Sequence, residues 1–244
     1  MLFRSVDYLP GCAELGDFDA TSTTIALEPA GAAGVLPPAA LHRTFAKYEE
    51  FFTARLNGEP WEAFTPYEMR TLGSYVRLGR RELLPKMLKF FLEHRKPAGW
   101  RQWPEVVWHE ERAPKFLGDL PHTWVGSDFA RSVLDMLAYV READSALVVG
   151  AGVPEEWVAE SPGVRVRGLR TPMGRLDLGM PRTRDGVRVT LGEGLRVPPG
   201  GIAVNAPVRG PARPPLVDGK PALLNSGGEV VVRRLPATVD FRSR

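Results

Sequence analysis

The stretch PPAALHRTFAKYEEFFTARLNG, residues 37–58, determines the fold class of the first part of the chain. Its large apolar side chains recur at alternating spacings of four and three, which places them on one stripe of an α-helix. They are Leu41, Phe45, Tyr48, Phe52 and Leu56. Gly58 follows where a C-terminal cap is expected. The spacing therefore predicts an amphipathic helix that ends just before Gly58.

Helical periodicity continues through the first 142 residues. Thr65 is expected as an N-cap, with Pro66 in the first turn and Glu68 three residues after the cap. The connections alternate between very short and long, which suits an array of antiparallel α-hairpins. Further helices are expected over residues 21–27, 65–79, 82–95 and 121–142.

After Glu142 the period of the apolar residues becomes two, which is typical of strands. Asp185-Gly186 and Asp218-Gly219 are dipeptides that tight hairpins favour. Short strands between such turns predict an antiparallel, β-sandwich-like domain. The expected fold class is therefore α+β in two parts: an α-hairpin domain over 1–142 and a C-terminal β-domain over 143–244. The strand-like segments are 163–169, 186–192, 200–207, 221–225 and 228–241.

The composition excludes several classes of protein. The 244 residues are 43% hydrophobic and 25% charged, enough for one or two hydrophobic cores and unlike a disordered chain. The single cysteine makes neither an internal disulfide nor a cysteine-rich zinc site. No run approaches the roughly 20 apolar residues of a membrane span, and the first residues lack the core of a signal peptide. The sequence as written predicts a cytoplasmic protein without a membrane partner, or a secreted one if its natural start lies upstream.

Charge is distributed unevenly along the chain. Residues 1–142 carry 17 Lys and Arg against 19 Asp and Glu, whereas residues 143–244 carry 15 against 10. The excess is mostly arginine in alternating segments, which is typical of the solvated face of a sheet. Trp157 and Phe241 are the only aromatic residues of this half. Because nucleic-acid binding needs basic residues clustered with stacking rings, we expect no nucleic-acid partner.

Most catalytic motifs are absent from the sequence. It contains no phosphate-binding GxxxxGK[ST] loop, no HExxH, no GxSxG and no cysteine pair. SALVVGAGVPEEW (145–157) resembles the start of a dinucleotide-binding turn, but its third glycine is missing and Pro154 stands where the helix should begin. A strand with a glycine turn is the simpler interpretation. We therefore expect no cofactor and no metal.

Carboxylates occur near the starts of two of the predicted helices. If residues 17–19 are extended, Asp17 and Asp19 point to the same side; alternatively Asp19 caps the next helix and Asp17 is a solvated loop residue. Glu68 lies on a stripe with Leu72 and Tyr75. It is either a half-buried general acid with a raised pKa or a capping-box glutamate on Thr65.

The long connection over residues 99–124 is the third feature, because connections of this length are usually functional. Indole rings beside carboxylates suit sugar binding, since a pyranose stacks on the ring while its hydroxyls meet acids and arginines. The alternative is that the tryptophans fill the core under the connection. His109 and His122 are not at metal-ligand spacing. The tryptophans are Trp100, Trp103, Trp108 and Trp124, and the carboxylates are Glu105, Glu110, Glu111 and Asp119.

The sequence resembles the C-terminal part of bacterial six-hairpin glycosidase-like proteins, some of which carry discoidin-type sugar-binding domains. The resemblance rests on GCAELGDFDATSTTIAL (11–27), on residues 65–79 and on QWPEVV (102–107) with FLGDLPHTWVGSDFARSVLDMLAY (116–139), followed by a Gly/Pro-rich β-domain. It implies a partial (α/α)6 toroid that binds carbohydrate, and glycoside hydrolysis with inversion by two carboxylates.

The resemblance also implies roles for individual residues. Glu105 or Glu110 stands where related toroid enzymes place the catalytic base. The other implied catalytic or sugar-binding acids are Asp17, Asp19 and Glu68, and the implied substrate-binding residues are Trp103, Trp108, Trp124, His122 and Arg70. Which carboxylate is the acid and which the base stays open.

The chain departs from the family in its number of helices, because a full toroid needs twelve. We expect about five before the β-domain. The missing half then lies upstream, or a homo-oligomer covers the open face. Three hypotheses follow: a glycoside hydrolase or a fragment of one, a non-catalytic carbohydrate-binding module, and a structural or interaction module.

Overall fold

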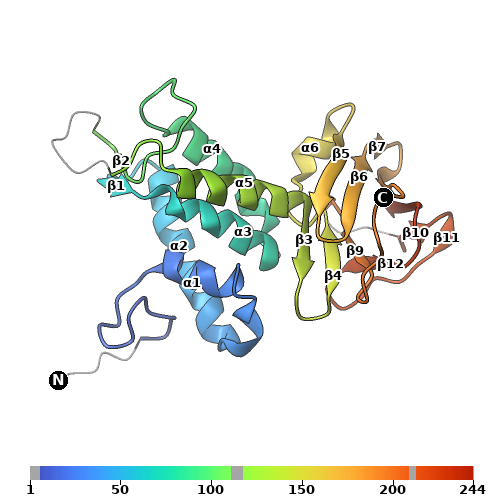
Figure 1. The fold of residues 1–244 in the computed structure, drawn as a ribbon, viewed down its shortest axis with the longest axis horizontal. Helices are drawn as coiled ribbons and strands as arrows, with labels where there is room; N and C mark the ends of the chain where they lie inside the picture. The colour runs from blue at the N-terminus through green and yellow to red at the C-terminus, as the bar shows by residue number, and fades with distance from the viewer. Residues whose placement is uncertain (1–5, 111–117, 209–212, 244) are drawn as a thin grey trace. The chain divides into compact units, whose positions relative to one another are not determined.

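A computed structural model describes residues 6–110, 118–208 and 213–243, and shows a mixed α+β protein (Figure 1). The chain forms two compact units. The first consists of the residues up to Leu78 together with Leu83–Val133, and the second consists of Gly79–Glu82 together with Leu134 onward. The second unit therefore begins within a helix, ahead of the boundary expected at residue 143.

Six α-helices occur among the described residues, and the sequence pattern predicts most of their positions. Asp19 caps α1, and Thr65 caps the 3-10 turn Pro66–Glu68 that leads into α3. Gly58 follows α2 with φ of +83°, as expected for a helix C-terminus. The helices are α1 (Ala20–Leu27), α2 (Pro38–Leu56), α3 (Met69–Arg77), α4 (Leu84–Glu93), α5 (Thr123–Leu137) and α6 (Glu155–Ala159).

The core of the first unit is aromatic. The apolar stripe of α2 is buried from Leu41 to Phe52, whereas Leu56 is partly exposed. The Phe45 ring meets Tyr75 of α3 edge-on at 5.7 Å, and the Phe52 ring meets Phe90 of α4 at 5.3 Å. This interlocking of rings from three helices fixes how α2, α3 and α4 pack together.

The strands of the described residues form three sheets. A two-stranded sheet pairs β1 with β2 in the first unit, and the second unit holds a seven-stranded sheet and a four-stranded sheet of order β12-β9-β4-β3. The seven-stranded sheet has the order β11-β10-β13-β8-β6-β5, with β7 pairing β8. The strands are β1 (Ala63–Phe64), β2 (Val107–Trp108), β3 (Ala138–Arg141), β4 (Ala146–Val149), β5 (Val164–Thr171), β6 (Gly174–Met180), β7 (Arg182–Thr183), β8 (Gly186–Leu191), β9 (Ile202–Asn205), β10 (Leu216–Val217), β11 (Lys220–Pro221), β12 (Glu229–Val232) and β13 (Ala237–Arg242).

Three details correct the expected β-domain. β4 and β9 pair in parallel, whereas the sequence predicted antiparallel pairing throughout. Residues 221–225 are not a strand beyond Pro221, and Leu223 is 88% exposed. Gly186 pairs with Thr183, so Arg184 and Asp185 are the central residues of that turn, one position earlier than the expected Asp185-Gly186. At the other expected turn, Asp218 and Gly219 take the predicted positive φ angles.

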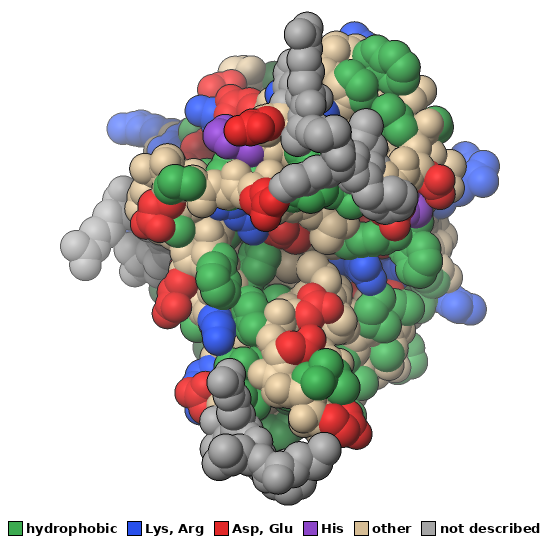
Figure 2. All heavy atoms as spheres, turned by 90° about the vertical axis from the view of Figure 1, so that its left-hand side faces the viewer, with side chains coloured by type: hydrophobic (Ala, Val, Ile, Leu, Met, Phe, Trp, Pro, Cys, Tyr) green, Lys and Arg blue, Asp and Glu red, His purple; other side chains and the backbone are tan. Residues whose placement is uncertain are grey.

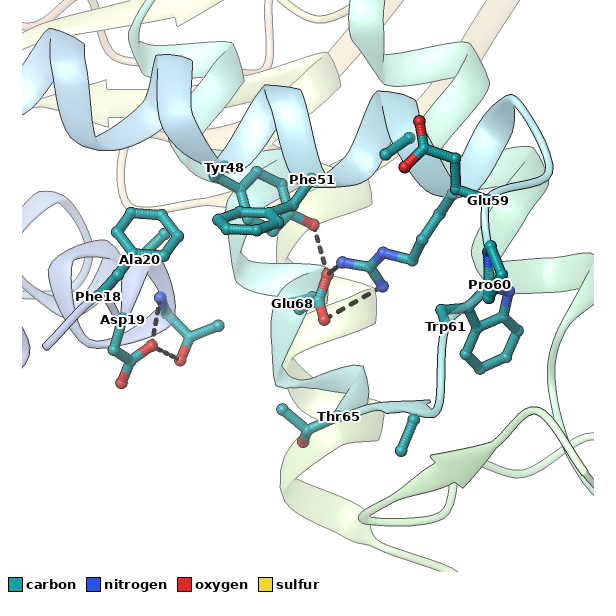
Figure 3. Close-up of a pocket in the computed structure, with 14 residues that line it drawn as sticks. Phe18, Asp19, Ala20, Tyr48, Phe51, Glu59, Pro60, Trp61, Thr65 and Glu68 are labelled. Carbon is teal, nitrogen blue, oxygen red and sulfur yellow. Dashed lines mark hydrogen bonds and ion pairs between the residues drawn. The ribbon is translucent and has the colours of Figure 1, made fainter.

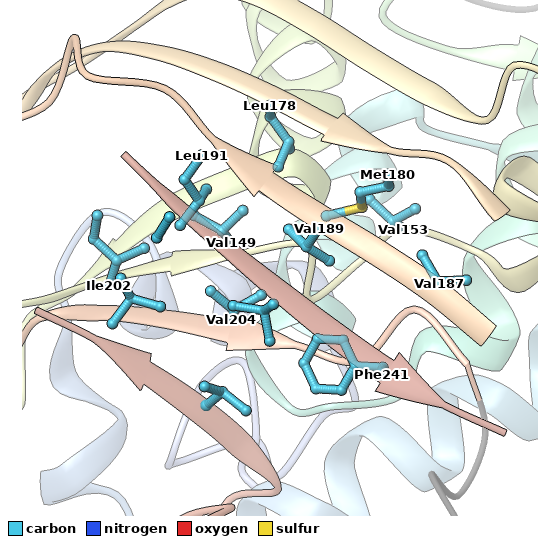
Figure 4. Packing of buried hydrophobic residues seen from close by; sticks show 14 of the residues in the cluster. Val149, Val153, Leu178, Met180, Val187, Val189, Leu191, Ile202, Val204 and Phe241 are labelled. Atoms are coloured by element: carbon cyan, nitrogen blue, oxygen red, sulfur yellow. The ribbon is translucent and has the colours of Figure 1, made fainter. Parts of the chain in front are cut away.

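One aliphatic cluster joins the two sheets of the second unit. Figure 4 shows Val149, Ile202 and Val204 of the four-stranded sheet packed with Leu178, Val189 and Phe241 of the seven-stranded sheet. Every one of these side chains is at most 2% exposed. Burying such large apolar side chains is the main contribution to stability that this unit offers.

The glycine turn after β4 packs against the unit's own core. A Cβ on Gly152 would lie 2.6 Å from the Cα of Met136, and one on Gly150 would meet the Met180 side chain. Hydrogen bonds from Arg81 to the carbonyls of Gly150, Ala151 and Ala206 hold the turn from outside. The turn is therefore part of the packing, which agrees with the simpler interpretation of residues 145–157.

Candidate functional site

The first unit contains an open cleft of about 430 Å³ between the start of α1, the second half of α2 and the segment from Glu59 to Glu68 (Figure 3). Phe18 and Phe51 form one wall, with ring centroids 5.5 Å apart, and Trp61 stands on the opposite side. Phe51 is 53% exposed, although its neighbour Phe52 is buried. We call this site the aromatic cleft. Its walls offer ring surfaces that are open to solvent.

The floor of the aromatic cleft is a buried carboxylate with two partners. The Tyr48 hydroxyl donates to Glu68 Oε2 at 2.6 Å, and Arg55 donates to both carboxylate oxygens, at 2.7 and 3.3 Å. Glu68 is 8% exposed, so water solvates its carboxylate poorly. The ion pair with Arg55 is therefore the main compensation of its charge. Such a bidentate pair holds both side chains in one geometry.

Aromatic rings surround the Arg55 guanidinium. Its central carbon lies 5.5 Å from the Phe90 centroid and 5.8 and 5.9 Å from those of Phe52 and Phe64. Burial alone would lower the pKa of Arg55, but the Glu68 carboxylate raises it above its usual value. Burial, together with Glu68, raises the pKa of Tyr48 well above that of a free tyrosine. The floor is therefore a fixed group of one cation, one anion and one protonated phenol.

Asp19 lines the same cleft but acts as a helix cap. Its Oδ1 accepts from the backbone N–H groups of Thr21 and Ser22, at 2.9 and 3.3 Å. Burial would raise the pKa of Asp19, but hydrogen bonds from Ser22 and Thr21 lower it below its ordinary value. Asp19 is therefore an ionised carboxylate at neutral pH, in agreement with the capping interpretation. Asp17 is an exposed loop residue whose Oδ1 accepts from the N–H of Cys12 at 2.8 Å.

Three of the residues implied as sugar-binding come together in a second group, around Tyr67. The Tyr67 hydroxyl lies 2.7 Å from His122 Nε2, and its ring meets that of Trp124 at 5.6 Å. Arg70 lies over the Tyr67 ring at 4.9 Å and 3.2 Å from Asp128 Oδ2. We call these five residues the Tyr67 group. Trp124 is 56% exposed, so its ring is open to solvent.

Electrostatics in the Tyr67 group differ from those of the cleft floor. Burial raises the pKa of Asp128, and Arg70 and His122 oppose that shift. Burial and the nearby Glu105 carboxylate raise the pKa of Tyr67. The Arg70 Nε and Asp128 Oδ2 atoms are buried and make no hydrogen bond in the described part of the chain. Their attraction is therefore that of an ion pair alone, without a hydrogen bond between the two groups.

One carboxylate of the long connection, that of Glu105, stabilises the connection's own conformation. Glu105 and Asp119 close a loop, in which the Glu105 N–H donates to the Asp119 carbonyl at 3.1 Å and the Asp119 N–H donates to Glu105 Oε2 at 3.3 Å. Glu110 is exposed after β2, and Glu111 lies outside the described residues. The structure places neither Glu105 nor Glu110 among the residues that line the aromatic cleft.

The tryptophans of the connection divide between core and surface. Trp103 is 6% exposed and packs against Phe129 with centroids 5.3 Å apart, so its ring is closed to a ligand from solvent. Trp108 is half-buried in β2, where it pairs with Ala63. That pairing carries His109 to within 4.6 Å of the Trp61 ring and so supports one wall of the cleft. Trp108 therefore contributes to the cleft through strand pairing.

Sequence reasoning missed Arg55, Phe18, Phe51 and Trp61. One signal for Arg55 was present: it stands seven residues after Tyr48, and two turns of helix return to nearly the same face. A charged residue on an otherwise apolar stripe implies a buried partner. The identity of that partner, Glu68, depends on tertiary packing.

No group of three or more His, Cys, Asp and Glu side chains is placed to hold a metal ion in the described part of the chain. Within that same part, no helix combines the length and the apolar character needed to cross a lipid bilayer. Comparisons of the chain with protein-family models, with curated proteins and with solved structures found no match.

Proposed function

We propose that the first unit binds carbohydrate in the aromatic cleft. The observation that carries the proposal is the exposed ring of Phe51 beside Phe18, opposite Trp61 and above the hydrogen-bonding floor of Glu68 and Arg55. Apolar walls with a few convergent polar groups are typical of small-ligand sites. A pyranose offers one apolar face to a ring and hydroxyls to a polar floor, so it fits both elements.

The volume and openness of the cleft suit a short segment of a longer chain. About 430 Å³ is within the range of ordinary ligand pockets. Figure 2 shows hydrophobic side chains at the centre of this face of the first unit, with Asp and Glu side chains around them. The acidic lining supports a neutral or basic sugar, because an acidic one would meet the carboxylates of Asp19 and Glu59 on opposite sides of the cleft.

Glycoside hydrolysis is a second candidate function, favoured by one observation: Asp19 and Glu68 line the same cleft. Hydrolysis with inversion needs one protonated acid and one carboxylate. The lowered pKa of Asp19 keeps its carboxylate ionised, and the oxygens of Glu68 are already engaged by Arg55 and Tyr48. These contacts support binding without turnover over hydrolysis.

The finer architecture is part of the proposal. We infer that the helical unit is a portion of an (α/α)6 toroid, as the family resemblance implies, and that the second unit is a β-sandwich. The cluster shared by Leu178 and Val189 of one sheet with Val149 and Val204 of the other supports the sandwich. The packing of α3 against α1 and α4 is compatible with successive α-hairpins.

The experiment is a titration of the whole protein with a panel of neutral and amino oligosaccharides of two to six sugars. Phe51→Ala removes an exposed ring without opening the core, so we expect about tenfold weaker binding and an unchanged melting temperature. Trp124→Ala is the matched control, because it removes an equally exposed ring of the Tyr67 group.

Two results would decide between the hypotheses. Release of new reducing ends by the wild-type protein would support hydrolysis and contradict binding alone. Binding that Trp124→Ala abolishes and Phe51→Ala leaves intact would place the sugar at the Tyr67 group and contradict the assignment to the cleft.

A further inference from the structure

The hairpin of β5 and β6 carries a concentration of arginine at one edge of the seven-stranded sheet. β5 is the last strand in the order of that sheet, and it presents Arg165, Arg167 and Arg170, all exposed. Arg175 of β6 is exposed as well and is the direct cross-strand partner of Arg170. We call these four residues the arginine face.

The pleat of the hairpin shows that these residues turn away from the core. Val164, Val166 and Leu169 of β5 pack on the aliphatic cluster of the second unit, and Leu176 and Leu178 of β6 are buried in it. Successive side chains of a strand point to opposite faces of the sheet. The arginines between them therefore lie on the solvent side.

A bulge interrupts the alternation of β5 within this face. The register of β5 and β6 shifts between Val166 and Leu169, so that Arg167 and Gly168 both lie opposite Asp177. Gly168 takes a φ of +65°, and its N–H donates to Asp177 Oδ1 at 2.6 Å. Asp177 is the acidic residue opposite the bulge, and part of its hydrogen-bonding capacity is used by the backbone.

Within the described residues, the hairpin of β5 and β6 carries four arginines against one acidic residue, Asp177. None of the four arginines forms an ion pair there, whereas Arg188 of β8 is held by Asp240 at 2.6 Å on the same sheet. Like charges directly opposite on paired strands are destabilising. The pair of Arg170 with Arg175 is therefore a local cost that a bound anion would remove.

We propose that the arginine face binds a linear acidic polysaccharide, with sulfate or carboxylate groups on the guanidinium groups. Arg165 and Arg170 are five residues apart on an extended strand, about 17 Å, too far for one small anion to contact both. A polymer with repeated charges engages all four at once. Guanidinium is the side-chain group that pairs best with planar or tetrahedral oxyanions.

Nucleic acid fits this face less well. Single strands bind through stacking on aromatic rings, but Phe241 is 1% exposed and Trp157 belongs to α6 rather than to the sheet. Base readout in a duplex needs an element that enters a groove, and the side chains here stand on a sheet. The inference uses a surface distinct from the aromatic cleft and does not depend on the proposed function.

The experiment measures binding of the full chain to four fluorescent probes of matched length. They are a heparin oligosaccharide, an oligogalacturonate, a single-stranded DNA and a duplex DNA. We expect binding to at least one acidic oligosaccharide at about 50 mM salt and loss of at least tenfold in affinity at about 300 mM, because exposed charges are screened. Neutral dextran is the uncharged control.

The charge-reversal variant R165E/R170E/R175E should bind about tenfold more weakly or not at all, while R165Q/R170Q/R175Q should lie between it and wild type. Arg234→Glu, an exposed arginine outside the face, is the matched control and should change affinity by less than about twofold. Circular dichroism and melting curves check that each variant folds. The proposal is overturned if neither oligosaccharide binds, if either DNA binds as tightly as the better oligosaccharide, or if the folded triple variants bind like wild type.

Discussion

The floor of the aromatic cleft and the Tyr67 group use the same three kinds of residue in different ways. Each combines an arginine, a carboxylate and a tyrosine. In the cleft, Arg55 donates two hydrogen bonds to Glu68, whereas Arg70 and Asp128 approach to 3.2 Å without forming one. Both pairs are largely buried, so they differ in geometry: hydrogen bonds fix the first, whereas the second is an ion pair without a hydrogen bond.

This difference shows that the environment decides what a set of polar residues does. Arg55 is enclosed by three rings of the aromatic core, so its charge depends on Glu68. Arg70 lies near the rings of Tyr67 and Trp124 and beside Asp128, to which its buried Nε makes no hydrogen bond. Breaking the two ion pairs should consequently have unequal effects on stability.

The largest effect is expected at the cleft floor. Arg55→Ala leaves the buried Glu68 carboxylate without its cation, so the free energy of unfolding should fall by about 3–5 kcal/mol. Urea denaturation followed by circular dichroism measures it. The double variant R55M/E68L removes both charges, so it should recover most of that loss. A double variant no more stable than Arg55→Ala would contradict the account of the floor as a compensated pair.

A smaller effect is expected at the cap of α1. Asp19→Ala removes the acceptor for the N–H groups of Thr21 and Ser22, which should cost about 1 kcal/mol. Asp19→Asn keeps an N-cap side chain and should be nearly neutral at pH 7. A loss as large in the asparagine variant as in the alanine variant would contradict the capping role.

The same cap predicts a dependence on pH. The folded pKa of Asp19 lies below its unfolded value, so its contribution to stability is complete above the unfolded pKa of about 3.9 and is lost as the pH falls through the folded pKa. Asp19→Asn cannot titrate. Since the two proteins should be about equally stable at pH 7, wild type should become less stable than Asp19→Asn on acidification below about pH 4, and a difference that does not change with pH would argue against an ionised cap.

The smallest effect is expected in the Tyr67 group. Asp128→Asn keeps the shape of the side chain and relieves the burial of a charge, while it weakens the attraction to Arg70. Because the cost of burying the Asp128 charge offsets much of its attraction to Arg70, the free energy of unfolding should stay within about 1 kcal/mol of wild type. A loss comparable to that of Arg55→Ala would show that the two groups are not different in kind.

Local sequence patterns predicted the helices and strands better than they predicted the candidate functional site. The spacing of Leu41, Phe45, Tyr48 and Phe52 predicted α2, and the Asp19 cap followed from its place before Thr21, because both signals depend on nearby residues alone. The parallel pairing of β4 with β9 joins segments more than fifty residues apart in the chain, and no local pattern encodes such a pairing.

The site was predictable only in part, for the same reason. Arg70, His122 and Trp124 were each predicted to bind sugar; the structure brings them together around Tyr67, and their binding role stays a prediction. Trp103 and Trp124 look alike in the sequence, yet one is 6% and the other 56% exposed, because packing against Phe129 buries the first. The aromatic cleft draws its walls from three separate segments, so only the folded chain brings Phe18, Phe51 and Trp61 together.

Tryptophan fluorescence during an oligosaccharide titration tests the central claim, carbohydrate binding in the aromatic cleft, most directly. Trp61 belongs to the cleft and Trp124 to the Tyr67 group, so each reports on one location. We expect saturable changes in emission for wild type and Trp124→Phe, and a much smaller change for Trp61→Phe. A response that survives in Trp61→Phe and disappears in Trp124→Phe, or no response to any sugar, would contradict the account.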